Sequence, residues 1–250
     1  MDHAELAQRL LEADDEVQAE LLNSHAPLAD VNLARELKQL CTDYWNTDPH
    51  CAHRAAKTLE GLAALNREPE VAAFAAWTAG YAALVAGQMR VSINHFDEAE
   101  AAFNSIGQAH TAAETQVIKL YPLAMLGRYD EAVECGLRAR AVFVAHGDAL
   151  SAGKIEHNIG NIYQRRDRYR EAENFLRAAR ERFAEFADEK RLAQIDNSLA
   201  NTLSFQHKFR AAEALHKQAL ERAERAGLLV TQAEIESKSV HMKLAQTTHF

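Results

Sequence analysis

A short pattern, an aromatic residue followed three positions later by alanine, recurs along the chain and constrains its fold more than any other feature. It occurs at four places: Phe96-Asp-Glu-Ala99, Tyr129-Asp-Glu-Ala132, Tyr169-Arg-Glu-Ala172 and Phe209-Arg-Ala-Ala212. The intervals between the alanines of these patterns are 33, 40 and 40 positions. Self-similarity at a period of this size predicts a stacked repeat protein, in which each unit buries its apolar face only against its neighbours.

The stretch from Lys154 to Arg180 indicates what one repeat contains, namely two amphipathic helices folded back on each other. Apolar residues recur at helical spacing on both sides of the polar run 164–168. Gly160 lies inside the first apolar stripe, where a glycine costs about 1 kcal/mol relative to alanine. A glycine at such a position predicts the close approach of a second helix.

Residue sizes vary in a consistent way at one predicted contact of each helix pair. The predicted contacts, one per repeat, are Leu120 with Gly136, Gly160 with Leu176, and Ala200 with His216. A large residue thus meets a small one in each repeat, as close packing requires. The pattern therefore supports the pairing of each helix with the next one.

Helices are predicted along the whole chain, because only four prolines and ten glycines interrupt it and no stretch alternates as a strand would. Asp48 is expected to cap the helix that starts at Pro49. The sequence predicts early helices at residues 4–23, 30–45, 50–66, 69–87 and 93–106. It predicts helix pairs at about 68–106, 109–146, 148–186 and 188–226, and a final helix at 228–246.

Small residues at Gly160 and Ala172, with Tyr163, Leu176 and Ala179 at their relative spacings, resemble the helix pair of the tetratricopeptide repeat (TPR) family. The resemblance implies an all-α fold, a right-handed α-solenoid of antiparallel helix pairs. The usual TPR period is about 34 residues, so a period of 40 implies longer helices, as in kinesin light chains. We expect an N-terminal helical segment of degenerate repeats or a cap at residues 1–67, and the TPR-like solenoid at residues 68–250.

Three phrases also resemble the N-terminal TPR region of bacterial proteins that carry a C-terminal CHAT domain, a caspase-like peptidase module. They are Ala76-Trp-Thr-Ala79, Gln116-Val-Ile-Lys-Leu120 and Ala124-Met-Leu-Gly-Arg-Tyr-Asp-Glu-Ala132. This resemblance implies a regulatory TPR segment whose catalytic domain is absent from this chain. A reading frame that continues past Phe250 into a His/Cys domain would support it, whereas a stop codon there would count against it.

In the TPR frame, the first helix of each pair lines the concave face of the solenoid. The resemblance assigns twelve residues to a peptide-binding groove on that face: Tyr121, Lys154, His157, Asn158, Asn161, Arg165, Gln194, Asn197, Asn201, Phe205, Lys238 and His241. In peptide-binding TPRs, asparagines at the position shared by Asn161 and Asn201 bind the ligand backbone or a terminal carboxylate. An amide carries donors and an acceptor, so it can bond both N–H and C=O groups of a peptide. Lys154, Arg165 and Lys238 would add selectivity for anions.

The polarity of this face also fits a surface that is merely solvated. Asparagine is a poor helix former, so four asparagines within two predicted helices favour a ligand as the reason for their presence. Tyr121-Pro122 lies in the middle of a predicted helix on the same face. Proline there removes a backbone hydrogen bond, so it either widens the groove through a kink or is a tolerated irregularity.

Other classes of function find little support in the sequence. The net charge of −8 disfavours a nucleic-acid or anionic-membrane surface, and no apolar run is long enough to span a membrane. Three unpatterned cysteines fit reduced thiols, so a cytoplasmic location is expected. His50-Cys-Ala-His53 lacks the fourth ligand of a zinc site, and no nucleotide-binding or nucleophile motif occurs. We expect no metal, no cofactor and no catalytic residue.

The repeat pattern and the TPR resemblance together predict a non-enzymatic scaffold that binds a peptide or protein segment in its concave groove, and the resemblance to CHAT-associated proteins implies a bacterial origin. The alternative is the regulatory TPR segment of a CHAT-type protease. A third option, a signal-peptide sensor resembling bacterial quorum regulators, would require a DNA-binding or phosphatase helical module. The acidic segment at residues 1–66 does not resemble a helix-turn-helix domain.

Overall fold

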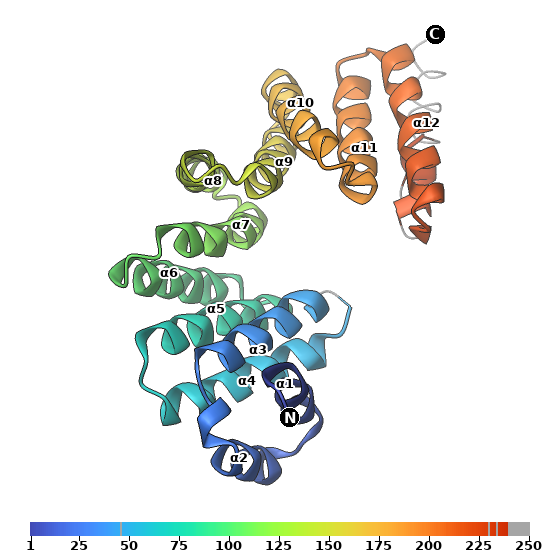
Figure 1. The fold of residues 1–250 in the computed structure, drawn as a ribbon. Helices are drawn as coiled ribbons and strands as arrows, with labels where there is room; N and C mark the ends of the chain where they lie inside the picture. Colours follow the sequence, from blue (N-terminus) through green and yellow to red (C-terminus); the bar gives the residue numbers. More distant parts are fainter. Residues whose placement is uncertain (46, 230, 234, 240–250) are drawn as a thin grey trace. The chain divides into compact units, whose positions relative to one another are not determined.

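The computed structural model describes residues 1–45, 47–229, 231–233 and 235–239, and all regular elements within them are helices (Figure 1). Consecutive helices pack as antiparallel pairs of the TPR type, which confirms the predicted all-α fold. The chain divides into two compact units, Met1–Arg128 and Tyr129–Phe250.

The first unit contains seven α-helices and one 3-10 turn among its described residues. They are α1 (His3–Glu12), α2 (Asp15–Ser24), η1 (Ala26–Leu28), α3 (Val31–Tyr44), α4 (Pro49–Leu65), α5 (Pro69–Val85), α6 (Met89–Ser105) and α7 (Ala109–Met125). One continuous apolar core joins α1 to α7, with Phe74, Trp77 and Tyr81 of α5 buried in it. Asp48 caps α4 as predicted, since its side chain accepts a hydrogen bond from the Cys51 N–H.

The prediction of one helix over residues 4–23 was wrong, because the structure has two helices there. Ala13 adopts an extended conformation that ends α1. Asp14 then starts α2, because its side chain accepts a hydrogen bond from the Val17 N–H at 3.0 Å. An aspartate at this position supplies the acceptor that a new helix N-terminus needs. The apolar periodicity had concealed this break.

Among its described residues, the second unit contains one helix followed by two antiparallel helix pairs and by further helical residues. Its described helices are α8 (Tyr129–Ala145), α9 (Ala149–Arg165), α10 (Tyr169–Glu185), α11 (Glu189–Phe205) and α12 (Phe209–Arg225). Residues 231–233 and 235–239 of the predicted final helix are helical, whereas residues 240–246 of that prediction lie outside the described residues.

From α5 to α12, every helix is 17 residues long and starts 20 residues after the previous one. The period of a helix pair is therefore twice this spacing throughout, and the shorter interval between Ala99 and Ala132 reflects a wrong alignment. The structural equivalent of Tyr129 is Met89, the first residue of α6, rather than Phe96. Phe96 lies seven residues further along the helix. Two helical turns of displacement keep a residue on the same face, so the pattern matched in the wrong register.

The predicted contact between Gly160 and Leu176 is confirmed. A methyl group added at Gly160 would lie 2.7 Å from Leu176 Cγ, so the leucine side chain occupies the space that a larger residue would need. The same relation holds two helix pairs earlier, where a methyl group on Gly80 would lie 2.5 Å from the Phe96 ring. The contacts proposed for Leu120 with Gly136 and for Ala200 with His216 stay predictions.

Candidate functional site on helices α9 and α11

The predicted groove residues of the second unit follow one side of α9 and one side of α11. Within each helix they are three, four, seven and eleven residues from the first, which is the spacing of a single helix face. We call this surface the asparagine face, and define it by Lys154, His157, Asn158, Asn161 and Arg165 of α9, with Gln194, Asn197, Ser198, Asn201 and Phe205 of α11. All of these residues are half-buried except Arg165 and Phe205, which are exposed.

Side-chain hydrogen bonds join α9 directly to α11. His157 Nε2 lies 3.2 Å from Ser198 Oγ. Further along α9, the Gln164 amide donates to Thr202 Oγ1 at 3.2 Å and to the Ser198 carbonyl oxygen at 3.4 Å. These bonds make the asparagine face continuous across two helices that are separated in the sequence by α10. Gln164 was not among the predicted groove residues.

The electrostatic state of His157 follows from its surroundings. Burial, together with a smaller effect of the positive charge of Arg191, lowers the pKa of its imidazole to about 4. The ring is therefore neutral near pH 7, where it acts as a hydrogen-bonding group rather than as a cation. Next to Ser198, the Asn197 Oδ1 atom is buried and has no hydrogen-bond partner among the described residues. A buried acceptor without a donor is unusual and needs an explanation.

An exposed aromatic residue lies at the C-terminal end of this face. Phe205 is 56% exposed, although its ring stacks on Tyr169 with centroids 5.0 Å apart and planes 12° apart. Arg165 is exposed at the corresponding position of α9. The asparagine face thus combines amides in its centre with a cation and an aromatic ring at one end.

Three predicted groove residues lie outside the asparagine face. Tyr121 belongs to α7 of the first unit, where it is 45% exposed. The neighbouring Pro122 is buried inside α7, and the helix continues through it to Met125. Lys238 is an exposed helical residue near the end of the described chain, and His241 lies outside the described residues.

A pair of buried carboxylates lies on the same two helices and was not predicted from the sequence. Glu156 of α9 is fully buried between two arginines, since Arg140 Nε donates to it at 2.6 Å and Arg182 Nε at 2.8 Å. Its neighbours come from α8 and α10, the helices on either side of α9 in the chain. The carboxylate therefore ties three consecutive helices together.

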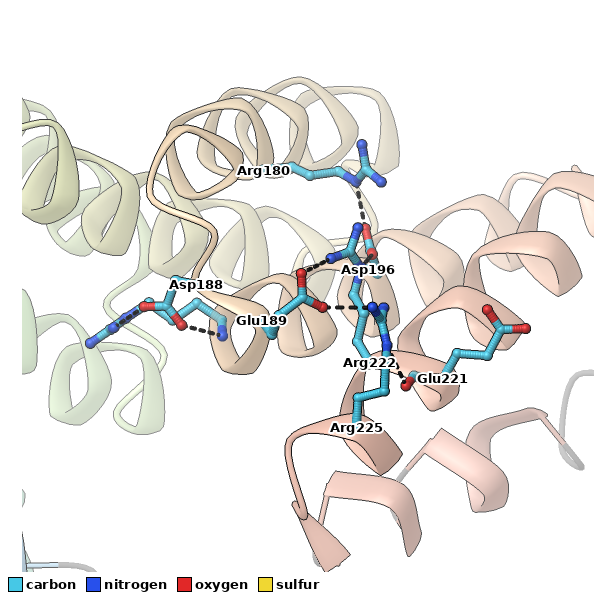
Figure 2. A network of polar contacts seen from close by, with 8 residues as sticks. Arg180, Asp188, Glu189, Asp196, Glu221, Arg222 and Arg225 are labelled. Atoms are coloured by element: carbon cyan, nitrogen blue, oxygen red, sulfur yellow. Dashed lines mark hydrogen bonds and ion pairs between the residues drawn. The ribbon is translucent and has the colours of Figure 1, made fainter.

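The same arrangement recurs one repeat later at Asp196 (Figure 2). Arg180 Nε donates to Asp196 at 2.5 Å, and Arg222 Nε lies 3.2 Å from the other carboxylate oxygen. Arg222 also donates to Glu189 at 2.7 Å. Asp196, Arg180 and Arg222 each lie one repeat period after their counterparts Glu156, Arg140 and Arg182. A search for charged residues that recur at that period would therefore have found both sites.

These buried ion pairs fix the arrangement on which the asparagine face depends. Removing one partner of a buried pair leaves an uncompensated charge, so a helix that packs in another register is strongly disfavoured. Glu156 and His157 are adjacent in sequence, as are Asp196 and Asn197. Each buried carboxylate thus orients the helix whose next residue belongs to the asparagine face.

Comparison with protein families shows that residues 151–225, which span α9 to α12, match the tetratricopeptide repeat family. No curated protein matches the chain by sequence. In the described part of the chain, no helix is long and apolar enough to cross a membrane, and no group of three or more His, Cys, Asp or Glu side chains could hold a metal ion.

Solved structures share this fold at low sequence identity. BtubC (BKLC) from P. vanneervenii aligns with a TM-score of 0.68 at 13% identity, over 90% of this chain and 91% of its own. Aspartyl phosphate phosphatase F from Bacillus subtilis gives a TM-score of 0.72 at 16% identity, over 93% of this chain and 63% of its own. The Rap conjugation gene regulator of plasmid pLS20 was solved in complex with the Phr* peptide. It gives a TM-score of 0.64 at 18% identity, over 86% of this chain and 59% of its own.

Proposed function

We propose that this chain is a non-enzymatic protein-interaction module whose asparagine face binds an extended peptide or an extended segment of a partner protein. The observation that carries the proposal is the row of half-buried amides on α9 and α11, two helices that hydrogen bonds hold side by side. The structural likeness to the Rap regulator supports a peptide as the ligand, because that protein was solved with a peptide bound.

The chemistry of the asparagine face suits an extended backbone. Asn161 and Asn201 carry two N–H donors and one acceptor oxygen each, which match the alternating C=O and N–H groups of a peptide. The unpaired Asn197 Oδ1 atom is one acceptor that a ligand N–H would satisfy. His157 is neutral near pH 7, so the centre of the face imposes no charge on the ligand. Lys154 and Arg165 would favour an acidic residue or a terminal carboxylate beside the backbone contacts.

The test requires a ligand selected on this chain. A peptide is first enriched from a random displayed library on the intact protein, and its Kd is measured by titration calorimetry. We expect Asn161→Ala with Asn201→Ala to weaken binding about 30-fold, since two lost hydrogen bonds of about 1 kcal/mol each add to roughly that factor. Circular dichroism checks that helix content is unchanged.

The matched control removes two asparagines elsewhere. Asn104→Ala with Asn174→Ala changes two exposed residues, one on α6 and one on α10, and should leave the Kd within about twofold of the original value. If the variant that lacks the Asn161 and Asn201 side chains bound the peptide as tightly as the original chain, with its fold intact, the proposal would be overturned.

A regulatory role within a CHAT-type protease stays the alternative. It rests on the sequence phrases around Trp77, Leu120 and Ala132. The reading frame downstream of Phe250 tests it directly. A His/Cys peptidase domain encoded there would decide for the alternative, whereas a stop codon would count against it.

A further inference from the structure

A groove of about 380 Å³ lies in the first unit between α3, α5 and α7. Its floor consists of Phe74 and Trp77 of α5, whose rings are parallel within 7° and have centroids 6.3 Å apart. Both side chains are almost fully buried, so the floor is a fixed part of the core. We call this site the α5 groove. Its volume lies within the range of pockets that bind small ligands or single side chains.

Cations of the chain itself cover this aromatic floor. Lys38 Nζ lies 4.0 Å from the centroid of the Trp77 ring, and Arg35 Cζ lies 5.9 Å from the centroid of the Phe74 ring. Both distances are those of a cation–π interaction. The two cations come from α3, which packs beside α5 (Figure 1). The α5 groove therefore already binds two side chains of the class that an aromatic floor prefers.

Carboxylates surround the same floor. Glu70 accepts a hydrogen bond from Arg35 at 2.8 Å, and Glu36 and Glu114 line the groove with it. Three carboxylates around two aromatic rings can hold a cation both by charge and by the ring faces. The indole N–H of Trp77 is buried and has no hydrogen-bond partner among the described residues.

The charge of the first unit adds a long-range contribution. Residues 1–128 contain 18 Asp or Glu and 9 Lys or Arg, for a formal charge of −9, whereas residues 129–250 contain 18 and 19, for a formal charge of +1. The net negative charge of the chain thus comes entirely from the unit that contains the α5 groove. Such a field raises the association rate of basic partners and disfavours acidic ones.

We propose that the α5 groove is a second interaction site, separate from the asparagine face, and that it binds an arginine or lysine side chain of a partner protein. The partner's cation exchanges with Lys38 over Trp77 and pairs with Glu36 and Glu114. The displaced Lys38 ammonium moves into solvent on its flexible stem. This exchange makes the site selective for basic segments.

The experiment uses the full chain with Trp45→Phe, which leaves Trp77 as its one tryptophan. The probes are eight-residue glycine and serine peptides, blocked at both ends, that carry either two arginines or two glutamates. We expect the arginine peptide to change Trp77 fluorescence with a saturable curve and the glutamate peptide to have no effect. Lys38→Met should tighten arginine-peptide binding about fivefold, because it removes the competing internal cation.

Charge variants separate the groove from the general field of the unit. Glu36→Gln with Glu114→Gln should weaken arginine-peptide binding about tenfold. Glu20→Gln with Glu60→Gln removes the same charge from exposed positions outside the groove and should change it less than twofold. Equal weakening by both pairs, preferential binding of the glutamate peptide, or no Trp77 response to the arginine peptide at millimolar concentration would overturn the proposal.

Discussion

At the scale of single residues, each regular connection between helices contains one residue with a positive φ angle, a conformation that favours glycine. The residues with positive φ fall every 20 positions, and five of them are glycines: Gly87, Gly107, Gly127, Gly147 and Gly227. The other three are Asp167, Ala187 and His207. Alanine cannot bond its own backbone in the left-handed region as aspartate can, so Ala187 at φ 50° is the most strained of the three.

Replacing this alanine should stabilise the chain. Ala187→Gly removes the clash between Cβ and the carbonyl oxygen, and the gain exceeds the entropic cost of glycine. We expect the free energy of unfolding to rise by roughly 0.5–1 kcal/mol, measured by urea denaturation followed by circular dichroism. Ala184→Gly makes the same chemical change three residues earlier, at an exposed position inside α10. There it should lower the free energy of unfolding by about 1 kcal/mol. If Ala187→Gly and Ala184→Gly both lowered the free energy of unfolding by similar amounts, the proposed strain at Ala187 would be contradicted.

The positions of two asparagines could be predicted from the sequence, whereas the burial of two carboxylates could not. Asn161 and Asn201 were predicted at equivalent positions of two successive repeats, and they lie half-buried at the same position of α9 and of α11. The burial of Glu156 and Asp196 was not predicted, since it depends on arginines from neighbouring helices. Local sequence cannot show that a charge is buried, because burial is a property of the assembled helices.

At the scale of helices, the packing of each pair depends on one large residue facing one small residue. Gly80 faces Phe96 and Gly160 faces Leu176, so the small partner lies on the first helix in both pairs. Periodicity alone predicted the pairs from α7 onward to within about one residue, because the regular connection of three residues leaves little freedom. It failed for the start of α6, where a shift of two turns preserves the buried face.

A double-mutant cycle tests this contact through a change of sign. Gly160→Ala should destabilise the chain by about 1–2 kcal/mol, because the added methyl group would lie 2.7 Å from Leu176 Cγ. In a Leu176→Ala background, the same substitution should instead stabilise by about 1 kcal/mol, through helix propensity and the filling of space.

The control for this cycle is a helical glycine without neighbours. Gly61 is exposed on α4, and a methyl group added there would meet nothing within 4 Å. Gly61→Ala should therefore stabilise by about 1 kcal/mol in either background. Equal effects of Gly160→Ala with and without Leu176, in urea titrations of the four variants, would contradict the proposed packing.

At the scale of the whole molecule, the repeat frame presents different chemistry in its two compact units. Phe74 and Trp77 of α5 occupy the helix positions that Lys154 and His157 occupy in α9, two repeats later. The first unit thus offers aromatic rings among carboxylates, and the second offers amides among arginines. The frame itself was predictable from the sequence. The α5 groove was not, because the side chains that cover Phe74 and Trp77 come from α3, which is distant from them in the sequence.

Binding of a peptide backbone by the asparagine face can be followed through the side-chain amide signals of its asparagines in nitrogen-15 NMR spectra. During titration with the selected peptide, the NH₂ signals of Asn161 and Asn201 should shift along one curve that gives the calorimetric Kd. The NH₂ signals of Asn104 and Asn174, which lie on other helices, should stay in place. Unmoved signals from Asn161 and Asn201 in the presence of saturating peptide would contradict the account.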